Sequence, residues 1–165
     1  MTVPADDFRQ VLSRFASGVT VVSTRDRAKN PIGVTVSAFS SVSLDPPLIL
    51  ICLDNATSNL KDYTDGGMFA VNILSNQQGS ISNAFAFPGP KPPFDQVAYS
   101  VGEMGLPLVD GAVASVQCET HAVYPGGDHV IVIGLVKHAQ WASDADPLIY
   151  VGGQYRALMQ SGLEG

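Results

Sequence analysis

Basic residues are scarce in this chain of 165 residues: nine Lys and Arg stand against fifteen Asp and Glu, for a formal net charge of −6 at pH 7. The nine are scattered along the sequence, so the sequence predicts no basic patch that would attract a nucleic acid. We therefore expect no nucleic-acid partner. Any ligand that carries phosphate must be held locally, by amides and hydroxyls, against the overall charge.

Cysteines and long apolar runs are also few. The two cysteines, Cys52 and Cys118, both lie in strand-like contexts, where buried free thiols are commoner than a disulfide or a metal pair. The segment Met1–Asp7 has neither the basic region nor the apolar core of a signal peptide. No apolar run approaches the length that crosses a bilayer. We expect a cytoplasmic protein that binds no membrane and no metal.

Several familiar catalytic and nucleotide-binding motifs are missing. No Gly-x-Gly-x-x-Gly follows a strand, and the chain has no Walker-type loop, so nucleotide binding of the Rossmann or P-loop kind is excluded. His-Glu-x-x-His and Gly-x-Ser-x-Gly are absent too. The chain thus lacks the residues for difficult chemistry of its own. If it is an enzyme, a cofactor is expected to carry the reaction.

What the sequence does contain is a series of short strand patterns. The apolar share is 45% and the charged share 15%, as in a compact folded protein, and we expect one domain over residues 1–165. Strands are predicted over the following ranges: Val19–Thr24, Ile32–Phe39, Leu48–Leu53 (buried on both faces), Met68–Leu74, Ala112–Tyr124, His129–Trp141, Pro147–Val151 and Gln154–Leu158.

Three short helices are predicted between these strands. The first begins at Asp7 as N-cap and ends near Gly18, with Phe8, Val11, Leu12 and Phe15 on one face. The second covers Ser58–Thr64 with Thr57 as its cap. The third opens with the capping-box pattern at Ser75 and runs towards Phe85. Many short strands with hairpin turns and few helices favour a mainly β fold, an antiparallel barrel with helical additions.

The most informative segment is Gly33–Pro47, in which Ser and Thr alternate with Val and Ala before a Pro-Pro pair. It reads as a strand that runs into a Ser-rich loop. Small side chains and hydroxyls would let a phosphate or a flat ring approach the backbone closely. A surface loop without function explains the same residues. The role of Asn72, inside an apolar strand, has two explanations as well. Its side chain is either functional or hydrogen-bonded to neighbouring backbone.

Four segments, in order along the chain, resemble the short-chain flavin reductases, the reductase components of two-component flavin-dependent monooxygenases. They are Phe15–Thr24; Gly33–Pro47; Phe69–Ser75 followed by Phe85-Ala86; and Gly127–Val130 with Ile133–Val136, closed by Pro147-Leu148 and Gly152–Arg156. The resemblance implies the fold of that family, an antiparallel split β-barrel that binds flavin.

The resemblance also implies a set of site residues. His129 would position the nicotinamide beside the flavin. The flavin itself would be bound by Thr35, Val36, Ser37, Ala38, Ser40, Ser41, Cys52, Leu53, Asp54, Thr57, Ser58, Asn59, Phe85, Ala86 and Tyr155. Near Ser58 the sequence offers no cation before Lys61, so hydroxyls and backbone amides are the groups available to the flavin phosphate.

The function implied by the resemblance is hydride transfer from NADH or NADPH to FMN or FAD, with reduced flavin passed to a partner monooxygenase. A homodimer is implied as well. Two alternatives share the same fold. One is a flavin-binding module without turnover, and the other is an oxidase of a phosphorylated pyridine vitamer, which the scarcity of basic residues disfavours.

Overall fold

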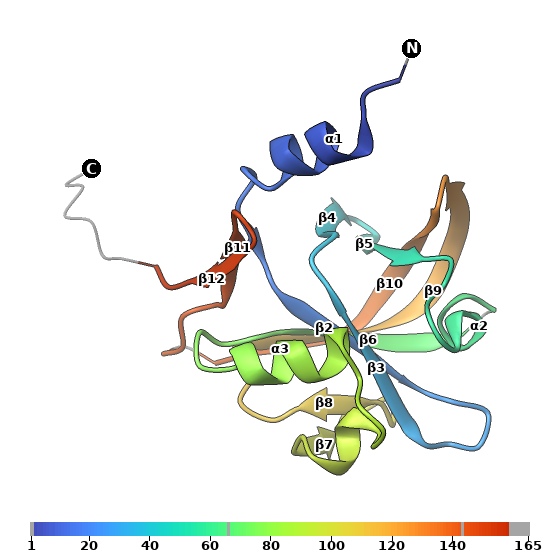
Figure 1. The fold of residues 1–165 in the computed structure, drawn as a ribbon. Helices are drawn as coiled ribbons and strands as arrows, with labels where there is room; N and C mark the ends of the chain where they lie inside the picture. Colours follow the sequence, from blue (N-terminus) through green and yellow to red (C-terminus); the bar gives the residue numbers. More distant parts are fainter. Residues whose placement is uncertain (1, 66, 143, 159–165) are drawn as a thin grey trace.

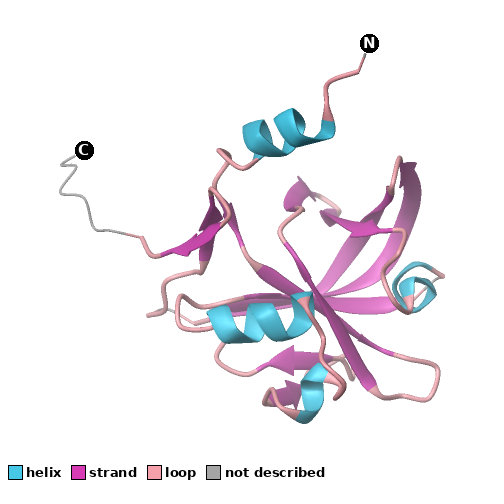
Figure 2. Cartoon of the chain, viewed as in Figure 1, coloured by secondary structure: helices cyan, strands magenta, loops and turns pink. Residues whose placement is uncertain are grey.

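A single antiparallel sheet of seven strands dominates the computed structural model, which describes residues 2–65, 67–142 and 144–158 (Figures 1 and 2). Its spatial order is β3-β2-β6-β9-β10-β5-β4, and every neighbouring pair is antiparallel. The strands are β2 (Thr20–Arg25), β3 (Pro31–Val36), β4 (Phe39–Leu44), β5 (Pro47–Asp54), β6 (Met68–Ile73), β9 (Ala114–Gly126) and β10 (His129–Trp141). The predicted mainly β fold, an antiparallel split barrel with few helices, is confirmed.

The two edges of this sheet meet where β3 runs into β4. Only Ser37 and Ala38 separate the two strands, although β3 and β4 lie at opposite ends of the strand order. The backbone N–H of Cys52, on β5, donates a hydrogen bond of 3.0 Å to the carbonyl of Ala38. The chain therefore curls the sheet on itself at this point, and the connection Ser37-Ala38 lies against the end of β5.

Small elements surround the sheet. A three-stranded sheet joins β1 (Ser17–Gly18), β11 (Ile149–Val151) and β12 (Gln154–Arg156), and a hairpin pairs β7 (Tyr99–Val101) with β8 (Pro107–Val109). The helices are α1 (Ala5–Leu12), α2 (Leu60–Thr64), α3 (Gly79–Ala86) and the 3-10 turn η1 (Pro93–Asp95). None of the helices in the described ranges has the length and apolar character needed to cross a membrane.

Three apolar clusters hold these parts together, of which the smallest joins Ala70 to Leu106 and Leu108, and the two larger ones matter for the site. One fills the barrel, with Ile51, Phe69, Val71 and Val132 fully buried. The other joins the sheet to α3 and η1. Gly33 permits the second contact, because a Cβ atom there would lie 2.9 Å from the ring of Phe85. A side chain at position 33 would push α3 away from β3.

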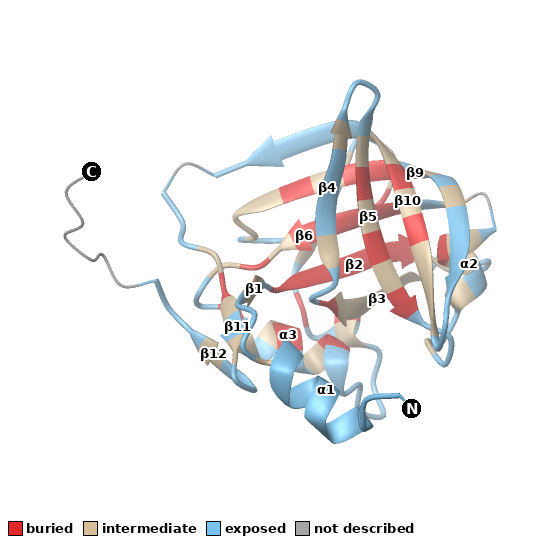
Figure 3. Ribbon diagram, turned by 90° about the horizontal axis from the view of Figure 1, so that it is seen from above, coloured by how far each residue is buried: buried red, intermediate tan, exposed pale blue. Residues whose placement is uncertain are grey.

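The segment expected to be a Ser-rich loop is instead the strand β4, and that prediction was wrong. As an edge strand, β4 pairs with β5 alone and leaves its hydroxyl side chains largely exposed (Figure 3). The prediction that β5 is buried on both faces was also wrong, because only one face of the strand points into the barrel core. Its burial alternates, with Ile49, Ile51 and Leu53 buried.

The helices were predicted in the right places with wrong starts. Helix α1 begins after Pro4, so Asp7 lies in its first turn and is not its cap. The predicted end near Gly18 is wrong too, because the helix ends at Leu12 and Ser17–Gly18 form β1. Helix α2 begins at Leu60 after Asn59, because the preceding residues form a turn in which Thr57 N–H donates to the carbonyl of Asp54. Helix α3 begins at Gly79, although Ser75 N–H does donate to Gln78 Oε1, as the capping box predicts.

Candidate functional site

A crevice opens where the connection between β3 and β4 meets the end of β5 and the start of β10. It encloses about 180 Å³. Its walls come from three segments that are distant in sequence: Val34–Ala38, Cys52–Asp54 with Thr57, and His129. The register of the sheet explains this meeting, because His129 pairs with Asp54 and Ile131 pairs with Cys52.

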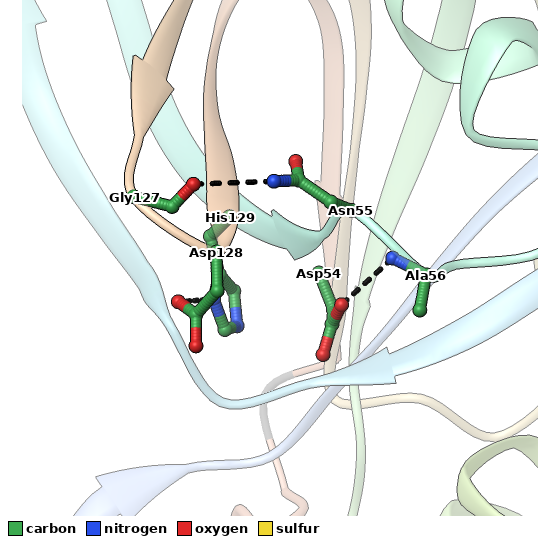
Figure 4. Close-up of polar contacts among 6 residues, drawn as sticks. All are labelled: Asp54, Asn55, Ala56, Gly127, Asp128 and His129. Carbon is green, nitrogen blue, oxygen red and sulfur yellow. Dashed lines mark hydrogen bonds and ion pairs between the residues drawn. The ribbon is translucent and has the colours of Figure 1, made fainter.

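The loop after β5 is tied to the turn before β10 (Figure 4). The backbone N–H of Asn55 donates to the carbonyl of Asp128 at 2.9 Å, and Asn55 Nδ2 donates to the carbonyl of Gly127 at 3.2 Å. On the other side, Ala56 N–H donates to Asp54 Oδ1 at 2.7 Å. These bonds fix the loop and the turn relative to each other, so the crevice is preformed on this side.

His129 stands at the rim of the crevice with its side chain 41% exposed. Its Nδ1 lies 2.7 Å from Oδ1 of Asp128. The hydrogen bond and the charge of His129 hold the pKa of the Asp128 carboxyl below its ordinary value. Asp128 therefore stays ionised at neutral pH and orients the imidazole. The contact engages Nδ1 and leaves Nε2 for a ligand.

The backbone of the β3–β4 connection supplies donors to the crevice. Both Ser37 and Ala38 are exposed, and within the described residues neither backbone N–H donates to another group of the chain. The hydroxyl of Thr35 is engaged, since it donates to the carbonyl of Ser82 at 2.7 Å. The backbone amides of Ser37 and Ala38 and the hydroxyl of Ser37 are thus the polar groups that this segment offers to a ligand.

A larger pocket of about 690 Å³ adjoins the crevice, and Thr35 and Ser37 line both. We call it the α3 pocket because α3 forms one wall. The rings of Tyr150 and Tyr155 lie 5.7 Å apart, and the Tyr155 hydroxyl is 2.9 Å from both Ser82 Oγ and Asn83 Oδ1. The aromatic walls of the α3 pocket and the polar groups among them suit a flat, partly polar ring.

The structure gathers most of the predicted site residues, in two groups. Nine line the crevice: Thr35, Val36, Ser37, Ala38, Cys52, Leu53, Asp54, Thr57 and His129. Ala86 and Tyr155 line the α3 pocket.

Five predicted residues lie elsewhere. Ser40 and Ser41 are on the exposed edge strand β4, and Ser58 lines neither pocket. Asn59 faces a separate groove. Phe85 is 2% exposed and packs its ring on Phe94, 4.8 Å away, in the apolar core.

Sequence reasoning missed several residues of the α3 pocket. Asn83 and Phe87 share one face of the helix end with Ala86, a spacing of three and four residues that could have been read from the predicted helix. No comparable signal identifies Val19 or Tyr150, which reach the pocket through the pairing of β1 with β11.

Comparisons with known proteins give a consistent result. The family model described as "Flavin reductase like domain" matches residues 12–159. A probable flavin reductase of Rhizobium meliloti is 43% identical over 147 residues, which are 89% of this chain and 47% of that protein. The reductase component of 4-hydroxyphenylacetate 3-monooxygenase from Thermus thermophilus is 38% identical over 92% of this chain and 95% of its own.

Among solved structures, the NADH:FAD oxidoreductase of Streptomyces globisporus in complex with NAD and FAD fragments is similar, with a TM-score of 0.89. It is 35% identical, over 98% of this chain and 99% of that one. The chain spans about half the length of some curated relatives, including the Rhizobium protein and the reductase component of an Acinetobacter baylyi trigonelline monooxygenase.

Proposed function

Since the chain belongs to the flavin reductase like domain family, we propose that it is an NAD(P)H-dependent flavin reductase, which passes a hydride from reduced nicotinamide to FMN or FAD. One observation carries this proposal. A crevice with unengaged backbone amides and a histidine adjoins a second pocket with aromatic walls, and both share Thr35 and Ser37. Two neighbouring sites fit a reaction between two flat rings.

The residues of the crevice fit a flavin. The N–H groups of Ser37 and Ala38 are free to donate to the polar edge of the ring, and Cys52–Asp54 form the adjacent wall. When bound, flavin supplies the acceptor for the hydride. The chain contributes donors on a fixed backbone, which favour negative charge that develops on a ligand beside them.

His129 acts in positioning. Hydride transfer between two rings requires no strong protein base, but it does require that the rings be held in contact. Asp128 fixes the imidazole at the rim of the crevice, from which it can contact a nicotinamide. In the His129→Ala variant we expect KM for NADH or NADPH to rise about tenfold while the Kd for flavin stays nearly unchanged. Unchanged KM would contradict the role of His129.

The second pocket favours an enzyme over a module that only binds flavin. A binding module needs one site, whereas about 690 Å³ beside the crevice leaves room for a second substrate. The crevice itself contains no Lys or Arg, which disfavours an oxidase that grips a phosphorylated pyridine vitamer.

We further propose that the reduced flavin serves a monooxygenase partner, as the names of several relatives suggest, and that the chain is a cytoplasmic homodimer. Two free thiols, Cys52 and Cys118, support a reducing compartment. The exposed apolar side chains of α1 support the dimer.

Anaerobic stopped-flow mixing tests the activity. Protein and either FMN or FAD are mixed with NADH or NADPH, and the flavin absorbance is followed. We expect bleaching that depends on the protein with at least one of the four combinations. The absence of bleaching in all four would contradict the proposal, and binding of flavin without bleaching would favour the module.

A further inference from the structure

A third hollow, the hairpin groove, lies between the β2–β3 hairpin and the segment that leads into α2, both at the right of Figure 1. It encloses about 720 Å³. The polar side chains along it are Asp26, Arg27, Asn55, Asn59, Lys61 and Asp62. The groove is four times as large as the crevice and plays no part in the hydride transfer proposed above.

The loop Asn55–Asn59 connects the groove to the crevice. Thr57 lines the crevice, whereas Asn55 and Asn59 line the hairpin groove. The same short loop is therefore a wall of both. A ligand whose ring fills the crevice and whose chain passes Thr57 has only this loop to cross before it enters the groove.

The groove carries two cations with no ion-pair partner. Among the described residues three ion pairs lie within 4 Å, and neither Arg27 nor Lys61 takes part in them. Of the two acidic residues, Asp26 is engaged in its own hairpin. Its carboxylate accepts hydrogen bonds from Asn30 N–H at 2.9 Å and from Asn30 Nδ2 at 3.0 Å.

The basic residues near the groove differ in what they contact. Four of the nine basic residues of the chain, Arg25, Arg27, Lys29 and Lys61, gather around this hairpin. Arg25 is used by the fold, since its Nε donates to the carbonyl of Gly105 at 2.6 Å. Lys29 lines an adjoining hollow and not the groove. Arg27 and Lys61 are thus the cations that line the groove, and both border the adjoining hollow as well.

We propose that the hairpin groove binds the adenosine phosphate half of FAD, with Arg27 and Lys61 on the phosphate. This assignment rests on the proposed function, in which the flavin ring lies in the crevice. The other side chains fit the rest of that half: Asp62 can accept from ribose hydroxyls, and the amide of Asn59 can pair with the edge of the adenine. FMN lacks this half, so the groove would make the protein prefer FAD.

Binding of both flavins without nicotinamide tests the assignment. Kd values for FAD and FMN are measured by the change of flavin fluorescence in wild-type protein and in the Arg27→Ala, Lys61→Ala and double variants. We expect each single change to weaken FAD binding about three- to tenfold and to leave FMN within about twofold, because a phosphate loses one charge-assisted bond at an exposed site. Arg27→Lys should restore part of the affinity.

The matched control is Lys29→Asn, which removes a charge from the same hairpin at a residue with φ of 69°, a conformation that Asn tolerates. It should leave both Kd values unchanged. Equal weakening of FMN and FAD would assign Arg27 and Lys61 to the phosphate that both flavins share and overturn the proposal, as would a higher KM for NADH with unchanged FAD binding.

Failure of this assignment can be told from failure of the proposed function. If wild-type protein reduces FMN and FAD but the variants bind FAD as wild type does, only the groove assignment falls. If wild-type protein binds neither flavin, the proposed function is contradicted and the groove assignment with it.

Discussion

The two thiols of the chain differ in what surrounds them. Cys118 is fully buried in the barrel core, and this burial raises the pKa of its thiol to about 12. Cys52 is half-buried and lines the crevice. Because the thiolate is the reactive form, Cys118 cannot react with an alkylating agent while the barrel stays folded.

Alkylation therefore tests the crevice at a single residue. N-ethylmaleimide added to folded protein near pH 8 should modify Cys52 and spare Cys118, as read by mass spectrometry of peptides. Prior addition of FMN or FAD should slow the modification of Cys52, and urea should expose both cysteines. Modification of Cys52 at the same rate with and without flavin would argue that flavin does not bind in the crevice.

The contact between Asp128 and His129 is the other test at the scale of one residue. Asp128 has a pKa below its ordinary value of 3.8 because His129 donates to it. Because the pKa of Asp128 is lowered in the folded protein, the contact contributes fully to stability at pH values above the ordinary pKa. This contribution is lost as the pH falls through the lowered pKa. Removing His129 should therefore let the pKa of Asp128 rise.

A titration of side-chain carboxyl carbons by NMR measures this rise. In His129→Ala, the pKa of Asp128 should return towards 3.8, while that of Asp26, which is lowered by hydrogen bonds from Asn30 and not by His129, should stay low. An ordinary pKa for Asp128 in the wild-type protein would show that the contact does not form in solution.

Among the elements, β6 depends on one buried amide. Asn72 is fully buried, and its Nδ2 donates to the carbonyl of Val21 and to Ser23 Oγ on β2. Its Oδ1 accepts hydrogen bonds from the backbone N–H of Val109 on β8 and from Ser115 Oγ on β9. A single side chain thus joins four strands, which answers the question that its sequence position left open. In the described structure, the Asn72 side chain provides hydrogen-bond partners for buried polar groups of the neighbouring strands.

Replacing Asn72 should accordingly cost stability. Asn72→Leu leaves several buried donors and acceptors unpaired, and we expect the free energy of unfolding to fall by about 2 to 4 kcal/mol in urea titrations. Asn76→Ala, at an exposed asparagine four residues further on, is the control and should change it by less than about 0.5 kcal/mol. A loss no larger at Asn72 than at Asn76 would contradict the network.

The elements that the sequence predicts best are those whose two ends carry strong local signals. The strand His129–Trp141 has the predicted bounds, because a Gly-rich turn starts it and a run of mostly apolar residues follows. Strand β4 was missed because Ser-rich alternation on an edge strand lacks the apolar face that marks a strand. The start of α2 was missed because the Asp54 carboxylate accepts a hydrogen bond from Ala56 N–H and holds the following backbone in a turn.

The site, too, has a part that the sequence identified and a part that it could not. The residues of Thr35–Ala38 were identified through the resemblance, and the fold brings them against Cys52–Asp54 and His129. The gathering of Arg27 with Lys61 could not be predicted, since these residues are 34 positions apart (61 − 27). Only the register of the hairpin and the course of the loop after β5 bring them to one groove.

At the scale of the whole molecule, α1 is left without a partner. None of its residues is buried, although its sequence has an apolar face. Phe8, Val11 and Leu12 are 54%, 68% and 53% exposed, and Phe15, just beyond the helix, is 79% exposed. Clustered apolar side chains at this exposure mark a surface that another chain covers. In the proposed homodimer that chain is a second copy.

The mass of the protein in solution tests this. Light scattering on a sizing column should give about twice 17.4 kDa for the wild-type chain. The double variant Val11→Asp with Phe15→Asp should shift the mass towards one chain, because burying two carboxylates in an apolar contact is strongly unfavourable. Val101→Asp changes a valine on β7 that is 61% exposed, against 68% for Val11, and should leave the mass unchanged. A wild-type monomer at all concentrations, or a dimer that survives the double variant, would remove α1 from the interface.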